Sequence, residues 1–432
     1  MAIEEQTRTQ PPSDSDAPAR KITGRLAASL SQHRFPVGYA IIVVTSAAWL
    51  TQLAAAWMRT GAEPFQGFAN DLLAGRLPYR DRVLEYPPYS IPIFLLPSLL
   101  FGRENYLGGF TLLTILGDFF MKFLLLSIGL RQSKTLWALS PLLFYCVSVP
   151  FLRGFILELY DIWPALICVA IVCLACSERH FLCGLALALG IGVKLYPVVF
   201  LPPLFVLAVR QGKGGKFAAG LAAGLLPILL LSFYLPWWRF AEFQGSRGLQ
   251  VESLYASILW LGEQLDLTRV EWVWSKSWYE VQGQLASDVI PLAHGIFIAA
   301  MGISTAIAVR IASKCEKPGI GEVSRMLLVP LLCFVGFNLV FSPQYMLWLL
   351  SLAALGSLKG NPWIVLMIPL ATCLTWFFYP SPEYNGGLNL PETIILVCRN
   401  LVVITTCVML VREAIPSLSH KSVNSSGASA SL

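Results

Sequence analysis

Four carboxylates lie beside three arginines in the aromatic-rich segment that follows the first apolar stretch of the chain. At a membrane face, such a grouping suits a site where a hydroxyl loses a proton and an anionic group leaves. An ordinary solvated loop with ion pairs is the structural alternative. The four carboxylates are Glu63, Asp71, Asp81 and Glu85.

Lys194 lies in a turn between two apolar stretches, 180–193 and 197–209, that are short for membrane helices. At 1.5 Å per residue each reaches roughly 20 Å, less than the bilayer core of about 30 Å. The turn is therefore expected below the outer surface, at membrane depth. Irregular backbone is tolerated there only against protein or a water-filled cavity, so a lysine at that depth is a candidate functional residue.

The elements that must position these residues are membrane helices. The chain of 432 residues is 56% hydrophobic and only 13% charged, whereas soluble domains carry about 25% charged residues. The apolar stretches are continuous rather than alternating, which predicts an all-α polytopic integral membrane protein and not a barrel. About twelve transmembrane helices are expected, near residues 37–58, 108–130, 134–150, 158–177, 180–193, 197–209, 216–236, 289–312, 324–341, 344–358, 361–379 and 391–412.

The apolar stretch 90–101 contains Pro92 and Pro97 and is too short to span a bilayer. We expect it to lie at the interface, or to re-enter, within the first outer loop. Asp118 and Lys122 are four residues apart inside one apolar stretch, a spacing that predicts an ion pair within the membrane.

The distribution of charge predicts the orientation of the chain. Basic residues exceed acidic ones in the N-terminal segment and in alternate connections, which places both termini in the cytoplasm by the positive-inside rule. We expect a disordered cytoplasmic tail at 1–36, a membrane-embedded domain at 37–412 and a second disordered cytoplasmic tail at 413–432. The long outer loops are expected at 59–106 and 237–288.

Two other classes of site are disfavoured. The net charge of +6 is spread over loop ends rather than gathered on one face, so no nucleic-acid partner is expected. The ten cysteines lie mostly inside apolar stretches, as buried hydrophobes do, and imply neither a metal site nor a disulfide framework.

Five short strings carry a resemblance to a known family. They are Gly75-Arg-Leu-Pro-Tyr-Arg-Asp81 with Glu85-Tyr-Pro-Pro88, Tyr160-Asp-Ile-Trp-Pro-Ala165, Val193-Lys-Leu-Tyr-Pro197, Gly248-Leu-Gln-Val-Glu-Ser253, and Phe341-Ser-Pro-Gln-Tyr345 with Trp348. Over roughly residues 37–412 the chain resembles the bacterial type C glycosyltransferases of the polyprenol-phosphate-mannose-dependent α-mannosyltransferase family. One string alone is weak, but five in family order are fairly specific.

The resemblance implies a multi-pass enzyme of the plasma (inner) membrane whose active site faces the periplasm or exterior. Such enzymes move a hexose, usually mannose, from a polyprenyl-phosphate donor to a lipid-linked or cell-surface glycan or glycolipid. Their catalytic base is typically an Asp just after the first helix. This chain departs from that pattern, because no Asp follows Trp57 before Asp71. Glu63 is the nearest carboxylate and the first candidate for the base, and Asp81 and Glu85 are the others.

The leaving group of such a transfer is an anionic lipid phosphate, which needs cations rather than a general acid. Lys194 as a point charge, Arg153 as a planar fork and Arg247 are the candidates for binding the donor phosphate. A structural ion pair for Lys194 and an interfacial anchor role for Arg153 are the alternatives. With a monophosphate donor and these cations, no metal or other cofactor is expected.

Polar side chains near the outer helix ends are candidates for binding the sugar or the acceptor. Asp161 can hold sugar hydroxyls or Lys194, or it can simply suit a helix N-terminus. An aromatic-belt position is the alternative for the tyrosine that heads the 344–358 helix. The candidates are Asp161, Tyr196, Glu252, Gln344 and Tyr345.

Two competing functions remain open. Many spans and broken helices also suit a multi-span transporter or a flippase of lipid-linked sugars, although the sequence contains no internal repeat. The missing Asp after the first helix keeps open a catalytically degenerate relative.

Overall fold

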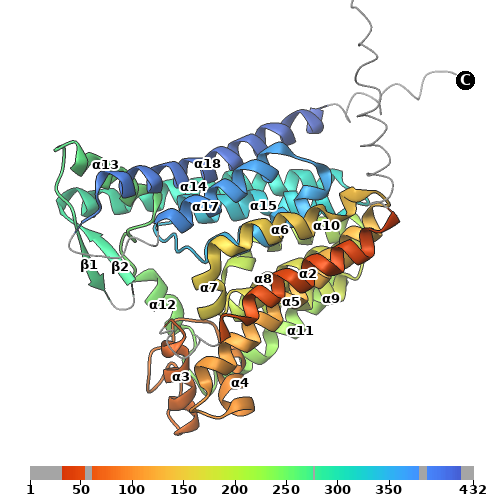
Figure 1. Cartoon of the computed structure of the whole chain (residues 1–432). Helices are drawn as coiled ribbons and strands as arrows, with labels where there is room; N and C mark the ends of the chain where they lie inside the picture. Colours follow the sequence, from red (N-terminus) through yellow and green to blue (C-terminus); the bar gives the residue numbers. More distant parts are fainter. Residues whose placement is uncertain (1–31, 54–60, 276–277, 379–386, 420–432) are drawn as a thin grey trace, which may run out of the picture.

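The computed structural model describes residues 32–53, 61–275, 278–378 and 387–419, with side chains through residue 414. The protein is 76% helical with almost no strand, which confirms the predicted fold class in its coarse form. In Figure 1 helix α2 (Arg34–Leu50) begins, and helix α18 (Leu390–Ser419) ends, at the same end of the molecule. The opposite end carries the two long connections (Figure 1).

Six segments in the described part of the chain are long and apolar enough to cross a membrane. They are α5 (Tyr106–Gln132), the composite Leu136–Glu158, α11 (Gly214–Leu231), α14 (Gln284–Lys314), α15 (Ile320–Phe337) and Leu390–Ala414 of α18. Shorter apolar helices accompany them, so a polytopic membrane protein is confirmed, while the number twelve stays a prediction. The shorter helices and the parts of the composite are α6 (Ser140–Ser148), α7 (Arg153–Glu158), α8 (Ile162–Cys176), α9 (His180–Val193), α10 (Leu201–Arg210), α16 (Tyr345–Gly356) and α17 (Ile368–Phe378).

Some helices extend past the ranges expected for them. The helix expected at 134–150 continues through the 3₁₀ turn Val149–Leu152 and α7 as far as Glu158, and α8 begins after it at Ile162. Helix α2 begins at Arg34 and α18 continues to Ser419, whereas the division of the chain into tails and a membrane domain stays a prediction. A hydrogen bond from Asn361 to the Glu413 carboxylate accompanies this extension, so the polar turn beyond residue 412 still belongs to the packed helix.

The first of the two long connections contains two helices. Helix α3 (Glu63–Leu73) and helix α4 (Ile91–Phe101) fold against α5 through stacked rings, with Phe65 4.7 Å from Phe94 and 5.5 Å from Phe110 between centroids. The stretch predicted as an interfacial element is therefore α4, although its depth in the membrane stays a prediction. This aromatic packing fixes the strip that runs from Leu84 to Tyr89, which is buried or half-buried throughout.

The second long connection contains the strands. It begins with α12 (Arg239–Gly245) and α13 (Leu254–Gln264), and an antiparallel hairpin of β1 (Glu271–Ser275) and β2 (Trp278–Gln282) follows before α14. The segment before α13 runs along β2, with the Val281 amide donating to the Leu249 carbonyl at 2.7 Å and the Val251 amide to Tyr279 at 3.2 Å.

Close helix packing fixes α9 against α11. A Cβ at Gly184 would collide with the carbonyl oxygen of Phe217, and a Cβ at Gly220 with that of Phe181, so α9 and α11 touch backbone to backbone. Small residues are the usual means of such contact inside membranes. Helix α16, whose twelve residues are all buried, forms the centre of the core beside α8 and α15.

The predicted ion pair inside α5 is present. Lys122 Nζ lies 2.6 Å from Asp118 Oδ2, and both side chains are almost wholly buried. The Tyr145 hydroxyl donates to Asp118 Oδ1 at 2.8 Å, which ties α6 to α5. A buried charge is stable only when it is paired in this way.

Removing one member of this pair should destabilise the protein more than removing both. Lys122→Met leaves Asp118 buried without its cation and is expected to cost about 3–5 kcal/mol. The double variant Asp118→Asn, Lys122→Met keeps an acceptor for Tyr145 and should lose less than Lys122→Met alone. Thermal unfolding of the purified protein in detergent measures both losses, and a double variant at least as unstable as Lys122→Met would contradict this account.

Candidate active site

Lys194 forms a buried ion pair at the predicted bend. It ends α9 in an extended conformation (φ −154°, ψ 137°), and the 3₁₀ turn Tyr196–Phe200 follows. Pro197 disfavours a helix that continues through Lys194, because it has no amide hydrogen and its ring would clash with the carbonyl of Val193, four residues earlier. Lys194 Nζ lies 2.6 Å from Asp161 Oδ1, with the lysine side chain 13% and the aspartate 1% exposed. Asp161 immediately precedes α8, so this pair joins two distant segments.

Aromatic rings surround this pair. The indole of Trp348 donates to Asp161 Oδ1 at 2.7 Å, and its ring lies between Tyr196 and Tyr345 at centroid distances of 4.0 and 3.9 Å. Lys194 Nζ lies 4.6 Å from the centroid of the Tyr160 ring and 5.1 Å from that of Trp348. Ring faces attract cations, so Lys194 is held both by the charge of Asp161 and by the quadrupoles of these two rings.

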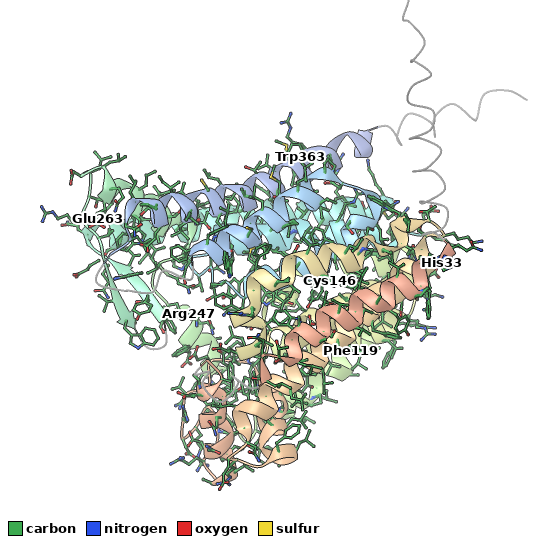
Figure 2. All side chains as sticks on the ribbon, viewed as in Figure 1. His33, Phe119, Cys146, Arg247, Glu263 and Trp363 are labelled. Carbon is green, nitrogen blue, oxygen red and sulfur yellow. The ribbon has the colours of Figure 1, made fainter. Side chains whose placement is uncertain are left out.

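A second carboxylate–cation pair lies within electrostatic range of the first. Arg247 Nη2 is 3.2 Å from Glu85 Oε2, and both side chains are about one-seventh exposed, at 15% and 13%. Lys194 interacts electrostatically with both members of this pair, and Arg247 also interacts with the Tyr345 hydroxyl. Figure 2 places Arg247 between the β-hairpin and the region of α3 and α4.

Six of the predicted site residues are thus brought together. We call them the paired-charge cluster: Glu85, Asp161, Lys194, Tyr196, Arg247 and Tyr345. They come from the strip before α4, the start of α8, the bend after α9, the segment after α12 and the start of α16. Their arrangement offers two cations for an anionic group and two carboxylates for hydroxyl groups.

The structure assigns Asp81 to its own turn. Its Oδ2 accepts the Leu77 amide at 2.8 Å and its Oδ1 accepts from Arg80 at 3.1 Å. The hydrogen bond from Leu77 holds the pKa of the Asp81 carboxyl below its ordinary value. Asp81 is exposed, and its hydrogen bonds and ion pair are made within its own turn rather than with the cluster, so its role as the base stays a prediction.

Two more predicted residues, Glu63 and Arg153, lie apart from the cluster, and a third, Gln344, lies next to it. Glu63 is exposed at the first turn of α3. Arg153 is exposed at the start of α7 and lines a different hollow, beside Trp376 of α17. Gln344 is half-buried directly before α16, next to the cluster in sequence, and its sugar-binding role stays a prediction.

The sequence matches a known family of glycosyltransferases. The model of glycosyltransferase family 87 matches residues 84–343, which is more than half of the chain. The chain belongs to glycosyltransferase family 87. It is therefore a membrane glycosyltransferase, as the resemblance implied in its coarse form. No curated protein and no solved structure matched the chain.

The family match covers the charged part of the cluster. It includes both carboxylate–cation pairs and ends just before Tyr345, whereas Glu63 and Asp81 lie outside it. Within the residues that the structure describes, no group of three or more His, Cys, Asp or Glu side chains is arranged to hold a metal ion.

Sequence reasoning missed the residues that hold the loop strip 248–253 of this family 87 enzyme. Arg399 of α18 is 2% exposed, donates to the Glu252 carbonyl at 2.5 Å and stacks 3.7 Å above the Phe341 ring. Asn400 donates to the same carbonyl at 3.3 Å. A charge inside an apolar span is the signal that could have drawn attention to Arg399. Glu252, a predicted ligand of sugar or acceptor, is itself buried and interacts electrostatically with Tyr345.

The strip is also tied to the start of α16. The Gln250 amide donates to the Leu339 carbonyl, and its side chain donates to the Ser342 hydroxyl, both at 3.0 Å. Because Arg247 directly precedes the strip, Arg399 positions the cation that pairs with Glu85.

Loss of the Arg399 guanidinium should loosen this strip. Arg399→Met removes a hydrogen bond from a charged donor, a contact worth about 1.5–3 kcal/mol, so amides of residues 248–253 should exchange about tenfold faster. Hydrogen–deuterium exchange with mass spectrometry measures this rate, and Arg399→Lys should restore part of the protection. Peptides from α3 serve as the internal control. Unchanged exchange in 248–253 would show that α18 does not hold the strip.

Proposed function

We propose that this family 87 enzyme transfers a hexosyl group, mannosyl in the first instance, from a polyprenyl-phosphate donor to a hydroxyl of a lipid-linked or cell-surface glycan. The proposed site faces the outer side of the plasma membrane, with both termini in the cytoplasm. The observation that carries the proposal is the paired-charge cluster, in which two buried cations are matched by two carboxylates beside an aromatic stack.

Lys194 and Arg247 are the proposed ligands of the donor phosphate. The donor phosphate is a diester that links the lipid to the sugar, and its negative charge allows it to replace a carboxylate at either cation. Arg247 can bind two phosphate oxygens with its planar fork, whereas Lys194 provides a compact charge. As the glycosidic bond breaks, negative charge grows on the phosphate. The two cations stabilise this charge more strongly in a site with little water than they would in bulk solvent.

Glu85 is the proposed general base. The acceptor oxygen bonds to the anomeric carbon while the carbon–oxygen bond to phosphate breaks, and the acceptor proton passes to the Glu85 carboxylate. The polyprenyl phosphate leaves with the bonding electron pair. Glu85 suits this role better than Asp161, because Asp161 is 1% exposed and its Oδ1 accepts from both Lys194 and Trp348.

The binding of phosphate to Arg247 is linked to the role of Glu85 as the base, because phosphate displaces the Glu85 carboxylate from Arg247. When phosphate oxygens occupy Arg247, the Glu85 carboxylate loses its ion pair and becomes available to a hydroxyl. The base is thereby freed only when the donor is bound, which disfavours proton abstraction in the empty site.

The remaining members of the cluster, Asp161, Tyr196 and Tyr345, are proposed to hold the sugar together with three neighbouring residues, Glu252, Gln344 and Trp348. Tyr196 and Tyr345 flank Trp348 in a continuous stack, a surface against which the apolar face of a hexose can pack. Asp161, Glu252 and Gln344 supply oxygens for hydroxyl groups. A pocket of apolar rings with a few convergent polar groups is the usual form of a small-molecule site.

A transporter or flippase is the less favoured function. Membership of a glycosyltransferase family argues for chemistry rather than translocation. A transport path would also need charges along its length, whereas Lys194, Asp161, Glu85 and Arg247 gather in one cluster.

Glu85→Gln should abolish most of the transfer. General-base catalysis contributes about 10²–10⁴-fold, so kcat should fall by at least about a hundredfold with little change in the KM for the donor. Lys194→Met and Arg247→Met should each lower kcat/KM for the donor about tenfold or more, because each removes a hydrogen bond to a charged group. Transfer of labelled mannose from polyprenyl phosphate to a lipid fraction in membranes measures all three variants.

Two variants from the same loop are the matched controls. Glu63→Gln and Asp81→Asn remove the same charge outside the cluster and should retain at least about a third of wild-type activity. Loss of activity in Glu63→Gln with retention in Glu85→Gln would move the base to α3. Activity that survives all of the cluster changes would defeat the assignment of this site, and wild-type protein without transfer from any polyprenyl-phosphate hexose would defeat the proposed donor.

A further inference from the structure

A second hollow, of about 470 Å³, lies on the helical body away from the paired-charge cluster. Its walls come from α2, from α6 with the 3₁₀ turn that follows it, and from α17. The Phe151 and Trp376 rings meet at one wall, edge to face, with centroids 6.2 Å apart. The lining residues include Ala48, Trp49, Cys146, Phe151, Arg153 and Trp376; Cys146 is labelled on α6 in Figure 2.

The charge of this hollow is unbalanced. Lys122 also lines it, but its charge is matched by Asp118 at 2.6 Å. Arg153 is exposed, and among the residues that the structure describes no carboxylate forms an ion pair with it. An apolar hollow with one unmatched guanidinium suits a molecule with a hydrocarbon chain and an anionic head.

We propose that this hollow binds an anionic membrane phospholipid, with the phosphate at Arg153 and one acyl chain between α2, α6 and α17. The hollow lies between apolar membrane helices, where lipid chains are the available apolar molecules. Apolar walls alone accept the chain of any lipid, so selectivity for the head group must come from Arg153. This lipid is distinct from the donor, because Arg153 does not join the cluster of Lys194 and Arg247.

Binding of anionic and zwitterionic lipids with the same acyl chains tests the proposal. Purified full-length protein in a neutral detergent is titrated with phosphatidylglycerol or phosphatidylcholine, and bound lipid is counted by native mass spectrometry. A basic side chain near an anionic lipid contributes roughly a fivefold preference, so wild type should bind phosphatidylglycerol about five times more tightly. Arg153→Gln should reduce this ratio to about one, and Arg153→Lys should keep it.

The hollow itself is tested by a pair of neighbouring alanines on α2. Ala48 lines the hollow and Ala47 does not, although both are exposed. Ala48→Phe should therefore lower the binding of both lipids about fivefold or more, whereas Ala47→Phe should leave it unchanged. Arg103→Gln removes an exposed arginine from another loop and is the charge control. Melting temperatures confirm that each variant is folded.

Three results would overturn the proposal. Equal affinity of wild type for the two lipids would remove its head-group selectivity, and an unchanged preference in Arg153→Gln would assign that selectivity elsewhere. Equal effects of Ala48→Phe and Ala47→Phe would show that the chain does not enter the hollow. These measurements use neither donor nor acceptor, so their outcome is independent of the transfer assay.

Discussion

A lysine inside a membrane protein is stable only when its charge is matched and shielded from lipid, and Lys194 meets that requirement through two other segments of the chain. Asp161 supplies the charge, and Trp348 donates to the same carboxylate oxygen. Tyr160 and Trp348 present their rings to the ammonium group. Because these partners come from α16 and from the residues just before α8, one largely buried charge fixes how these helices meet the bend after α9. The site geometry is thus a consequence of the pairing.

Buried charge recurs elsewhere in the molecule, but in forms that do not invite a ligand. Asp118 and Lys122 belong to one helix and satisfy each other. Arg399 donates to a backbone carbonyl and stacks on Phe341. The pairs of the cluster differ, since Lys194 and Arg247 each face a carboxylate from a distant segment and remain about one-seventh exposed. An anion can open such pairs by exchange, without unfolding a helix.

The sequence predicted what local rules determine. The two short helices and Pro197 predicted the bend at Lys194, and the four-residue spacing predicted the pair in α5. The partnership of Glu85 with Arg247 was beyond local rules, because 162 residues separate them and only the fold brings them together. The hydrogen bonds of Asp81 could not be predicted for a related reason, since composition does not reveal that the Leu77 amide and Arg80 donate to its two carboxylate oxygens. The number of spans stays a prediction, because prolines and 3₁₀ turns divide several apolar stretches into helices of fewer than 18 residues.

The absence of an aspartate directly after the first helix then has a physical interpretation. A general base must reach the acceptor hydroxyl next to the departing phosphate, so its distance from the phosphate-binding cations matters more than its place in the sequence. Glu85 meets that condition through its contact with Arg247, whereas Glu63 is exposed on α3 and Asp81 is bound to its own turn. The longer arm of a glutamate also suits a strip that is anchored by the packing of Leu84 and Tyr86 and cannot itself approach further. For the proposed transfer, the contact with Arg247 therefore favours Glu85 over the carboxylates that lie closer to the first helix.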